Sequence, residues 1–222
     1  MIIVPGKETG VALHHVKRVV RPSTLEGAWS EKTDRGSRAR FLAGGIDVVL
    51  YTPPKVDTLI DLAPLDLSGV KGVPKAVTIG AMTTMTEAVE SPALADHADA
   101  LLVRVLRQVA SPLQRNLATL GGTLGSAHPW SDVIPALLVL DAELTIYDGT
   151  ERTVSLEEHL KDRRALDQAI ICDVRLPEAR RATYGAFAAF TRTAFDIPLL
   201  NVACLTTVED DVWQDVRMAV GG

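Results

Sequence analysis

A glycine pair after a short apolar run is the first feature of this sequence that could do chemistry. The apolar run is 38–43, and the segment that contains its end and the glycine pair is Leu42-Ala43-Gly44-Gly45-Ile46-Asp47. Glycine carries no Cβ that would block a ligand, and it permits positive φ, so successive backbone amides can turn toward one point. Such a concavity suits a phosphate group. A plain tight turn fits the same pattern, and the segment alone leaves both interpretations open.

A second glycine-rich segment covers 115–126, with the sequence RNLATLGGTLGS. It combines glycine amides with the hydroxyl groups of Thr119, Thr123 and Ser126, which suits a pyrophosphate or a polyhydroxyl chain. Asp132 follows at the expected start of a helix, where it would either cap the helix or accept hydrogen bonds from a ligand. Two such segments together favour a nucleotide cofactor as strongly as they favour two structural turns.

Other chemistry finds no support in the motifs. Neither glycine segment is a G-x-G-x-x-G that opens a βαβ unit, and no G-x-x-x-x-G-K-[ST], H-E-x-x-H or G-x-S-x-G is present. The five histidines show no metal-ligand spacing, and only His128 lies near a candidate site. Arg115 could neutralise a phosphate or pair with a carboxylate. We therefore expect no catalytic side chain and no metal ligand in this chain.

Composition sets further bounds. The chain has 222 residues, with 23 basic and 28 acidic side chains and a net charge of −5, so nucleic acid is not an expected partner. Cys172 and Cys204 are too few and too far apart for a zinc or iron–sulfur site. The start of the chain reaches charge within seven residues, and no apolar run approaches the ~20 residues of a membrane helix. We expect a cytoplasmic protein without a signal peptide or membrane contact.

Hydrophobic spacing and turn residues predict an α+β fold. Ser or Thr followed three residues later by Glu predicts helix starts at Ser23, Thr84 and Ser155. The expected helices cover 24–32, 84–89, 96–110, 133–140 and a short segment after Ser155. The expected strands cover 38–43, 58–62, 76–79, 143–147, 152–154, 168–176, 183–191, 199–208 and 212–220.

Seven segments in chain order resemble the FAD-binding (medium) subunit of molybdenum hydroxylases, the group of xanthine dehydrogenase and carbon monoxide dehydrogenase. They are RPSTLE at 21–26, LAGGID at 42–47, IGAMTT at 79–84, ASPLQRNLATLGGTL at 110–124, AHPWSDVIPAL at 127–137, ERTV at 151–154 and DIPLLNVA at 196–203. The stretch 109–141 carries the most specific part of this resemblance, which runs from about Val19 to the end of the chain.

The resemblance implies an FAD domain of the p-cresol methylhydroxylase type. We expect an N-terminal arm at 1–18 and an FAD-binding domain at 19–178, with subdomains of about 19–75 and 76–178. The start of a truncated C-terminal α/β domain would follow at 182–222. The two glycine segments would hold the FAD pyrophosphate from opposite sides, and Leu176 would lie near the flavin ring. The implied FAD-binding residues are Leu42, Ala43, Gly44, Gly45, Ile46, Asp47, Val109, Ala110, Ser111, Gln114, Ala118, Thr119, Gly121, Gly122, Thr123, Ser126, Asp132 and Leu176.

By the same resemblance the chain would transfer electrons. Iron–sulfur clusters in a small partner subunit would supply them, after oxidation of substrate at a molybdopterin-binding large subunit, and FAD would pass them to NAD, oxygen or another acceptor. Three departures from the family pattern keep alternatives open: Ile46 replaces a usual Thr, 187–190 lacks a usual Lys, and the chain stops at 222. The alternatives are a degenerate, truncated paralogue that serves as a non-enzymatic assembly module and a free-standing flavin oxidoreductase.

Overall fold

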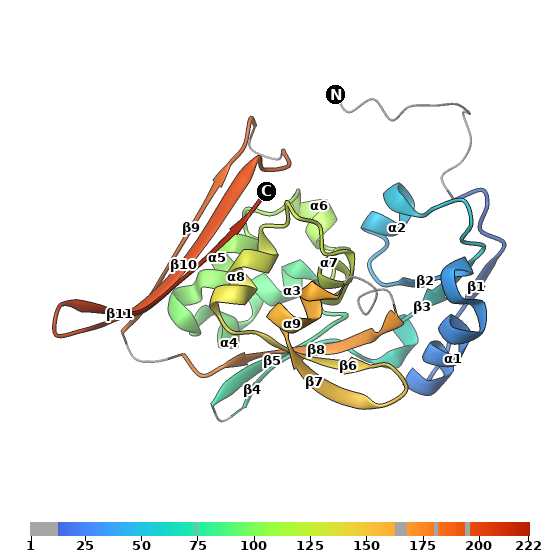
Figure 1. Ribbon diagram of the computed structural model, residues 1–222, viewed down its shortest axis with the longest axis horizontal. Helices are drawn as coiled ribbons and strands as arrows, with labels where there is room; N and C mark the ends of the chain where they lie inside the picture. Colours follow the sequence, from blue (N-terminus) through green and yellow to red (C-terminus); the bar gives the residue numbers. More distant parts are fainter. Residues whose placement is uncertain (1–12, 74, 163–167, 180–181, 194–195) are drawn as a thin grey trace.

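The structure is a computed structural model that describes residues 13–73, 75–162, 168–179, 182–193 and 196–222. Most of the expected N-terminal arm (residues 1–12) lies outside the described residues. Three separate β-sheets organise the rest (Figure 1). One sheet belongs to the segment 13–66, which we call the N-terminal lobe, and one belongs to the segment 67–179, which we call the central lobe. The third sheet is formed by the segment 182–222, and we call it the C-terminal sheet.

The N-terminal lobe is built on a parallel three-stranded sheet in the order β1-β3-β2. Its apolar side chains pack against the central lobe, where Ile60 and Ala28 share a core with Tyr147 and Ile170. This shared core fixes the two lobes next to each other. The elements are β1 (Arg18–Val20), α1 (Leu25–Arg35), η1 (Gly36–Arg38), β2 (Ala39–Leu42), α2 (Ile46–Tyr51), β3 (Thr58–Asp61) and η2 (Ala63–Leu65).

The central lobe contains an antiparallel five-stranded sheet in the order β4-β5-β8-β6-β7. Helices cover one face of it and bury the large apolar core of the molecule. Its strands are β4 (Val70–Val73), β5 (Ala76–Gly80), β6 (Glu143–Tyr147), β7 (Glu151–Ser155) and β8 (Ile170–Pro177). Its helices are α3 (Met85–Glu90), α4 (Pro92–Ala95), η3 (Ala98–Ala100), α5 (Leu101–Leu106), α6 (Pro112–Arg115), α7 (Leu120–Ser126), α8 (Val133–Val139) and α9 (Leu156–Lys161).

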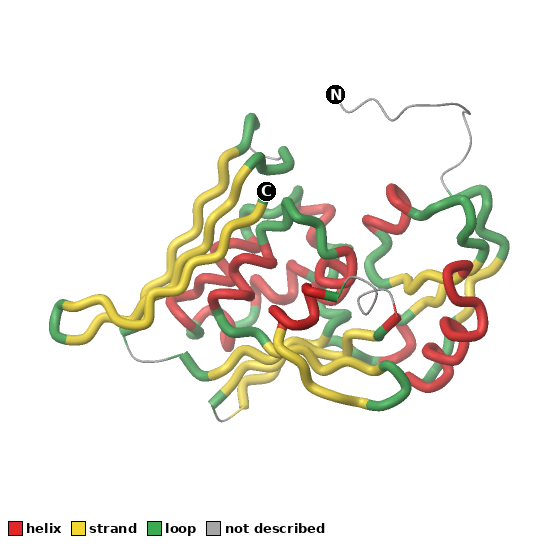
Figure 2. Tube along the Cα trace, viewed as in Figure 1, coloured by secondary structure: helices red, strands yellow, loops and turns green. Residues whose placement is uncertain are grey.

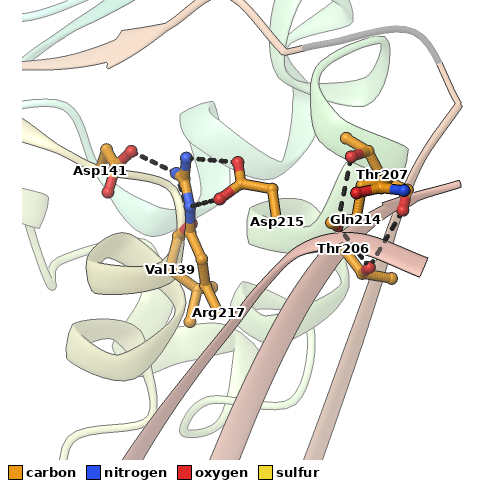
Figure 3. A network of polar contacts seen from close by, with 7 residues as sticks. All are labelled: Val139, Asp141, Thr206, Thr207, Gln214, Asp215 and Arg217. Atoms are coloured by element: carbon orange, nitrogen blue, oxygen red, sulfur yellow. Dashed lines mark hydrogen bonds and ion pairs between the residues drawn. The ribbon is translucent and has the colours of Figure 1, made fainter.

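The C-terminal sheet is an antiparallel meander of β9 (Thr183–Phe190), β10 (Leu200–Glu209) and β11 (Val212–Gly221). Its inner face packs on α5 and α8. The helices of the central lobe therefore lie between two sheets (Figure 2). Arg217 on β11 adds a polar attachment, because its guanidinium contacts both the Val139 carbonyl and the Asp141 carboxylate at the end of α8 (Figure 3).

Several details correct the sequence-based expectations. Thr24, not Ser23, caps α1, because its side chain accepts from the Gly27 amide at 3.1 Å. The helix expected over 96–110 is regular only over Leu101–Leu106, since the residues before it adopt left-handed φ. Strand β4 pairs with β5, so it lies in the central sheet although it precedes residue 76.

Candidate functional site

A cavity of about 560 Å³ lies where the N-terminal and central lobes meet. The loop between β2 and α2 forms one wall, and the segments around α6, α7 and the start of α8 form the other. Of the eighteen residues expected at the FAD site, those that line this cavity are Ala43, Gly44, Gly45, Ile46, Asp47, Val109, Ala110, Gln114, Ala118, Thr119, Gly121, Gly122, Thr123, Ser126 and Asp132.

The first glycine segment presents unbonded backbone amides to this cavity. Gly45 adopts φ +81° immediately before α2, a conformation that favours glycine. Among the described residues, the amides at 44–47 donate no hydrogen bond. Gly44 lies so close to the second segment that a Cβ would stand 1.7 Å from the Leu117 carbonyl oxygen. The two glycine segments therefore meet directly, and the amides at 44–47 are free to bind an anion.

The second glycine segment uses its amides differently. The Gly121 amide donates to the Ala81 carbonyl at 2.8 Å, and the Gly122 amide donates to Thr119 Oγ1 at 3.1 Å, which caps α7. A Cβ on Gly121 would lie 2.6 Å from the Ala81 Cβ. These glycines allow close packing within the protein. Because these amides are already bonded, this wall can contact a ligand mainly through hydroxyl groups and the surface of α7.

Asp132 lies in the cavity wall, and it does not act as the helix cap that was one of its two expected roles. Its side chain makes no capping bond to α8, and its Oδ1 accepts a hydrogen bond from Asn201 Nδ2 at 2.9 Å. Burial raises the pKa of this carboxyl above its usual 3.8, and the Asn201 hydrogen bond acts in the opposite direction. The group is thus a partly desolvated acceptor.

Three expected residues lie outside the cavity lining. Leu176 on β8 is fully buried in the main core, since this side chain points into the helical layer. Ser111 caps α6 through its hydrogen bond with the Gln114 amide at 3.3 Å. Leu42 packs beside Val48 in a small cluster of the N-terminal lobe. Leu176 and Leu42 serve the core, and Ser111 shapes the loop.

Three aromatic residues form part of the site, and of these only His128 was noted from the sequence as lying near a candidate site. The rings of His128 and Trp130 stack with centroids 4.6 Å apart and planes 10° apart. Tyr51 on α2 makes an edge contact with His128 at 5.1 Å. His128 Nε2 lies 3.3 Å from Asp47 Oδ1, yet this buried nitrogen makes no hydrogen bond within the described part of the chain. All of them line the cavity from both lobes. Tyr51 follows the first glycine segment closely and Trp130 precedes Asp132 closely, and this proximity in the sequence was the available signal.

The cavity fits an extended dinucleotide cofactor. Free amides at 44–47 can receive a pyrophosphate, hydroxyl groups at Thr123 and Ser126 can bond to sugar or ribityl oxygens, and flat rings offer a stacking surface. A Cβ at Gly125 would meet nothing within 4 Å, so this part of the wall is open. Among the described residues, no group of three or more His, Cys, Asp or Glu side chains could hold a metal ion.

Two lobes that meet at glycine segments define this chain as a domain that binds a dinucleotide cofactor. Residues 14–179 match the family described as the FAD binding domain in molybdopterin dehydrogenase. The chain belongs to this family, and it is an FAD-binding subunit of the molybdenum hydroxylase type. The resemblance, the α+β fold class and the FAD cofactor expected from the sequence are confirmed.

Individual relatives agree with this assignment. The chain is 30% identical over 215 residues to the nicotine 6-hydroxylase medium subunit of Paenarthrobacter nicotinovorans, covering 92% of this chain and 74% of that one. It is 33% identical over 193 residues to the nicotinate dehydrogenase FAD-subunit of Eubacterium barkeri, covering 80% of this chain and 64% of that one. The chain thus spans about two thirds to three quarters of the length of these relatives.

Solved structures support the fold. Carbon monoxide dehydrogenase from Hydrogenophaga pseudoflava superposes with a TM-score of 0.86 at 22% identity, covering 93% of this chain and 74% of that one. Quinoline 2-oxidoreductase from Pseudomonas putida 86 gives a TM-score of 0.81 at 23% identity, covering 93% of this chain and 73% of that one.

Within the described residues, no helix has the length and apolar character needed to span a membrane.

Proposed function

We propose that this chain holds FAD as the electron-transfer subunit of a molybdenum hydroxylase. The observation that carries the proposal is the cavity between the lobes, which gathers fifteen of the eighteen expected FAD residues beside unbonded amides. The relatives named as FAD or medium subunits of a hydroxylase and of two dehydrogenases support the same role.

The residues would divide the work of binding by their chemistry. The amides at 44–47 would hold the pyrophosphate, because successive N–H groups form an anion-binding concavity. Thr123 and Ser126 would bond to hydroxyl groups of the cofactor, and Asp132 would accept from a hydroxyl or N–H group. The stacked rings of His128 and Trp130 would exclude water beside a flat part of the cofactor.

The cofactor supplies the redox chemistry when bound, and the protein supplies placement and exclusion of water. We propose that a small partner subunit with iron–sulfur clusters delivers the electrons and that a molybdopterin-binding large subunit oxidises the substrate. The acceptor would be NAD, oxygen or another oxidant. The domain arrangement that we propose remains an FAD-binding domain at 19–178 followed by a second domain at 182–222, with β4 placed in the central lobe by its pairing.

The decisive experiment adds FAD to the purified apoprotein and follows the visible flavin absorbance that remains after gel filtration. We expect about one FAD per chain, and absence of bound flavin would contradict the proposal. Co-expression with candidate large and small subunits tests the second part, since a stable complex should form and substrate should then reduce the flavin. Reduction of bound flavin by substrate without any partner would instead favour a free-standing oxidoreductase.

A further inference from the structure

Asn201 connects the C-terminal sheet to the wall of the FAD cavity. It lies on β10, and its side chain is fully buried. Its amide nitrogen donates to Asp132 Oδ1 at 2.9 Å and to the Trp130 carbonyl at 3.3 Å. Both protons of this amide therefore bond to the segment 130–132, and each residue of that segment lines the cavity.

The orientation of the Asn201 amide follows from these contacts. A reversed amide would face its oxygen toward two acceptors, so only the nitrogen can point at the segment 130–132. The amide oxygen is buried without a hydrogen-bond partner in the described chain, and a Cβ on Gly221 would stand 2.5 Å from it. The Gly222 amide also donates to the Pro129 carbonyl at 3.0 Å. The residue directly after β11 thus bonds to the residue that directly precedes the segment 130–132.

We infer that Asn201 is a positioning residue of the FAD site, which orients the Asp132 carboxylate toward the cavity from the C-terminal sheet. The inference rests on the proposed function and goes beyond it, because it makes cofactor binding depend on a strand outside the FAD-binding domain. An acceptor that is fixed before the ligand arrives loses little conformational entropy on binding. Loss of Asn201 would leave Asp132 free to turn away.

The charged groups around Asp132 leave Asn201 as its polar partner in the described chain. His128 and Asp47 contact each other across the cavity, and Asp196 pairs with Arg192 at 3.0 Å. None of these groups forms an ion pair with Asp132 within the part of the chain that the structure describes. The protonation of Asp132 should therefore report the Asn201 hydrogen bond.

The test titrates FAD into the full apoprotein and follows the quenching of flavin fluorescence. Asn201→Leu places an apolar side chain of similar size in the buried position and removes both N–H donors. We expect the dissociation constant of FAD to rise roughly tenfold or more, as for loss of a hydrogen bond to a charged group. Asn201→Ser removes the long donor with less demand on packing, and it replaces Asn201→Leu if the latter does not fold.

The matched control is Arg217→Met, which removes the attachment of the same sheet at the other end of α8 (Figure 3). We expect a lower melting temperature and an unchanged dissociation constant of FAD. Equal weakening of FAD binding in Arg217→Met and Asn201→Leu would overturn the inference, because the effect would then reflect general docking of the sheet.

Two further readouts separate positioning from a merely structural role. In the Asp132→Ala background, Asn201→Leu should cause no additional loss of affinity, since both changes remove one interaction; additive losses would overturn the inference. Without the amide donor the pKa of Asp132 rises further, so the acidic limb of the affinity profile should move to higher pH. An unmoved profile would also overturn it.

The possible failures are distinguishable. If the unmodified chain does not bind FAD, the proposed function fails, and the inference fails with it. If the unmodified chain binds FAD and Asn201→Leu binds it equally well, the inference alone fails.

Discussion

Gly44 shows why one residue type is required where the two glycine segments meet. Its Cα faces the backbone of Leu117, and a Cβ would lie 1.7 Å from the carbonyl oxygen there. We expect Gly44→Ala to lower the free energy of unfolding by about 1–3 kcal/mol, as overpacked sites do, and to weaken FAD binding by separating the loops. Chemical denaturation measures the first effect and fluorescence titration the second.

Gly125→Ala is the matched control for Gly44→Ala, because it also changes a cavity-lining glycine and its Cβ would meet nothing within 4 Å. It lies inside α7, so alanine should leave stability unchanged or raise it by up to about 1 kcal/mol. Equal stability of Gly44→Ala and the unmodified chain would show that the loops do not need their close approach.

The partly buried carboxylate of Asp132 lowers the stability of the folded protein at neutral pH. A role in binding the cofactor would explain why such a group is present. Burial raises its pKa in the folded state above 3.8, so the folded protein holds this proton more tightly than the unfolded one. Stability is therefore lost as the pH rises through the window above 3.8. We expect Asp132→Asn to make the apoprotein at least as stable at neutral pH, with an advantage that shrinks in acid, as measured by urea unfolding.

The same variant should bind FAD roughly fivefold or more weakly, because a neutral acceptor makes a weaker hydrogen bond than a carboxylate. Stability and affinity would then change in opposite directions. A variant that loses stability at neutral pH and keeps full affinity would assign Asp132 a purely structural role.

At the scale of elements, the capping box of α3 shows how local sequence fixes the start of a helix. This helix contributes Met85 to the cavity wall. Thr84 Oγ1 accepts from the Glu87 amide at 3.2 Å, and Glu87 Oε2 accepts from the Thr84 amide at 2.7 Å. We expect Thr84→Ala to lower the free energy of unfolding by about 1 kcal/mol in chemical denaturation. Thr33→Ala removes an exposed hydroxyl from α1 and should change it by less than about 0.5 kcal/mol; similar losses in both would contradict the capping role.

Local signals predicted most of the elements because the strands and caps depend on nearby residues. The runs at 143–147, 183–191, 199–208 and 212–220 were confirmed to within a residue or two. The helix at 96–110 was wrong in length, because apolar spacing continues across residues whose backbone is left-handed. Spacing reports which side chains are buried and does not report where the backbone turns.

Long-range contacts account for what the sequence missed in the site. Loop composition singled out Gly45 and Thr119, and both line the cavity, while their contact with FAD stays a prediction. The contact of Tyr51 with His128 joins two lobes, and the bond from Asn201 to Asp132 spans two sheets. The alternation along β8 buries the Leu176 side chain in the core, and the position near the flavin that the resemblance implies stays a prediction.

At the scale of the whole molecule, the C-terminal sheet presents an apolar outer face. Alternation along the strands places one set of side chains away from α5 and α8: Tyr184, Phe190, Leu200, Met218 and Val220, each between 47% and 66% exposed. The ladder aligns them, since Phe190 pairs with Leu200, and Met218 and Val220 pair with Cys204 and Val202 of the central strand. A contiguous apolar face of this kind is uncommon on soluble monomers.

We therefore expect the isolated 222-residue chain to self-associate through this outer face, because burying apolar surface stabilises an associated state by about 25 cal/mol per Å². Light scattering at increasing protein concentration should show a growing mean mass.

The double variant Met218→Lys with Val220→Lys should remain monomeric, since two charges would be buried on association. Leu113→Lys is the control, because Leu113 on α6 is 77% exposed but lies off this face, and it should leave association unchanged. A chain that stays monomeric at every concentration, or one that Leu113→Lys dissociates equally well, would show that the outer face does not drive association.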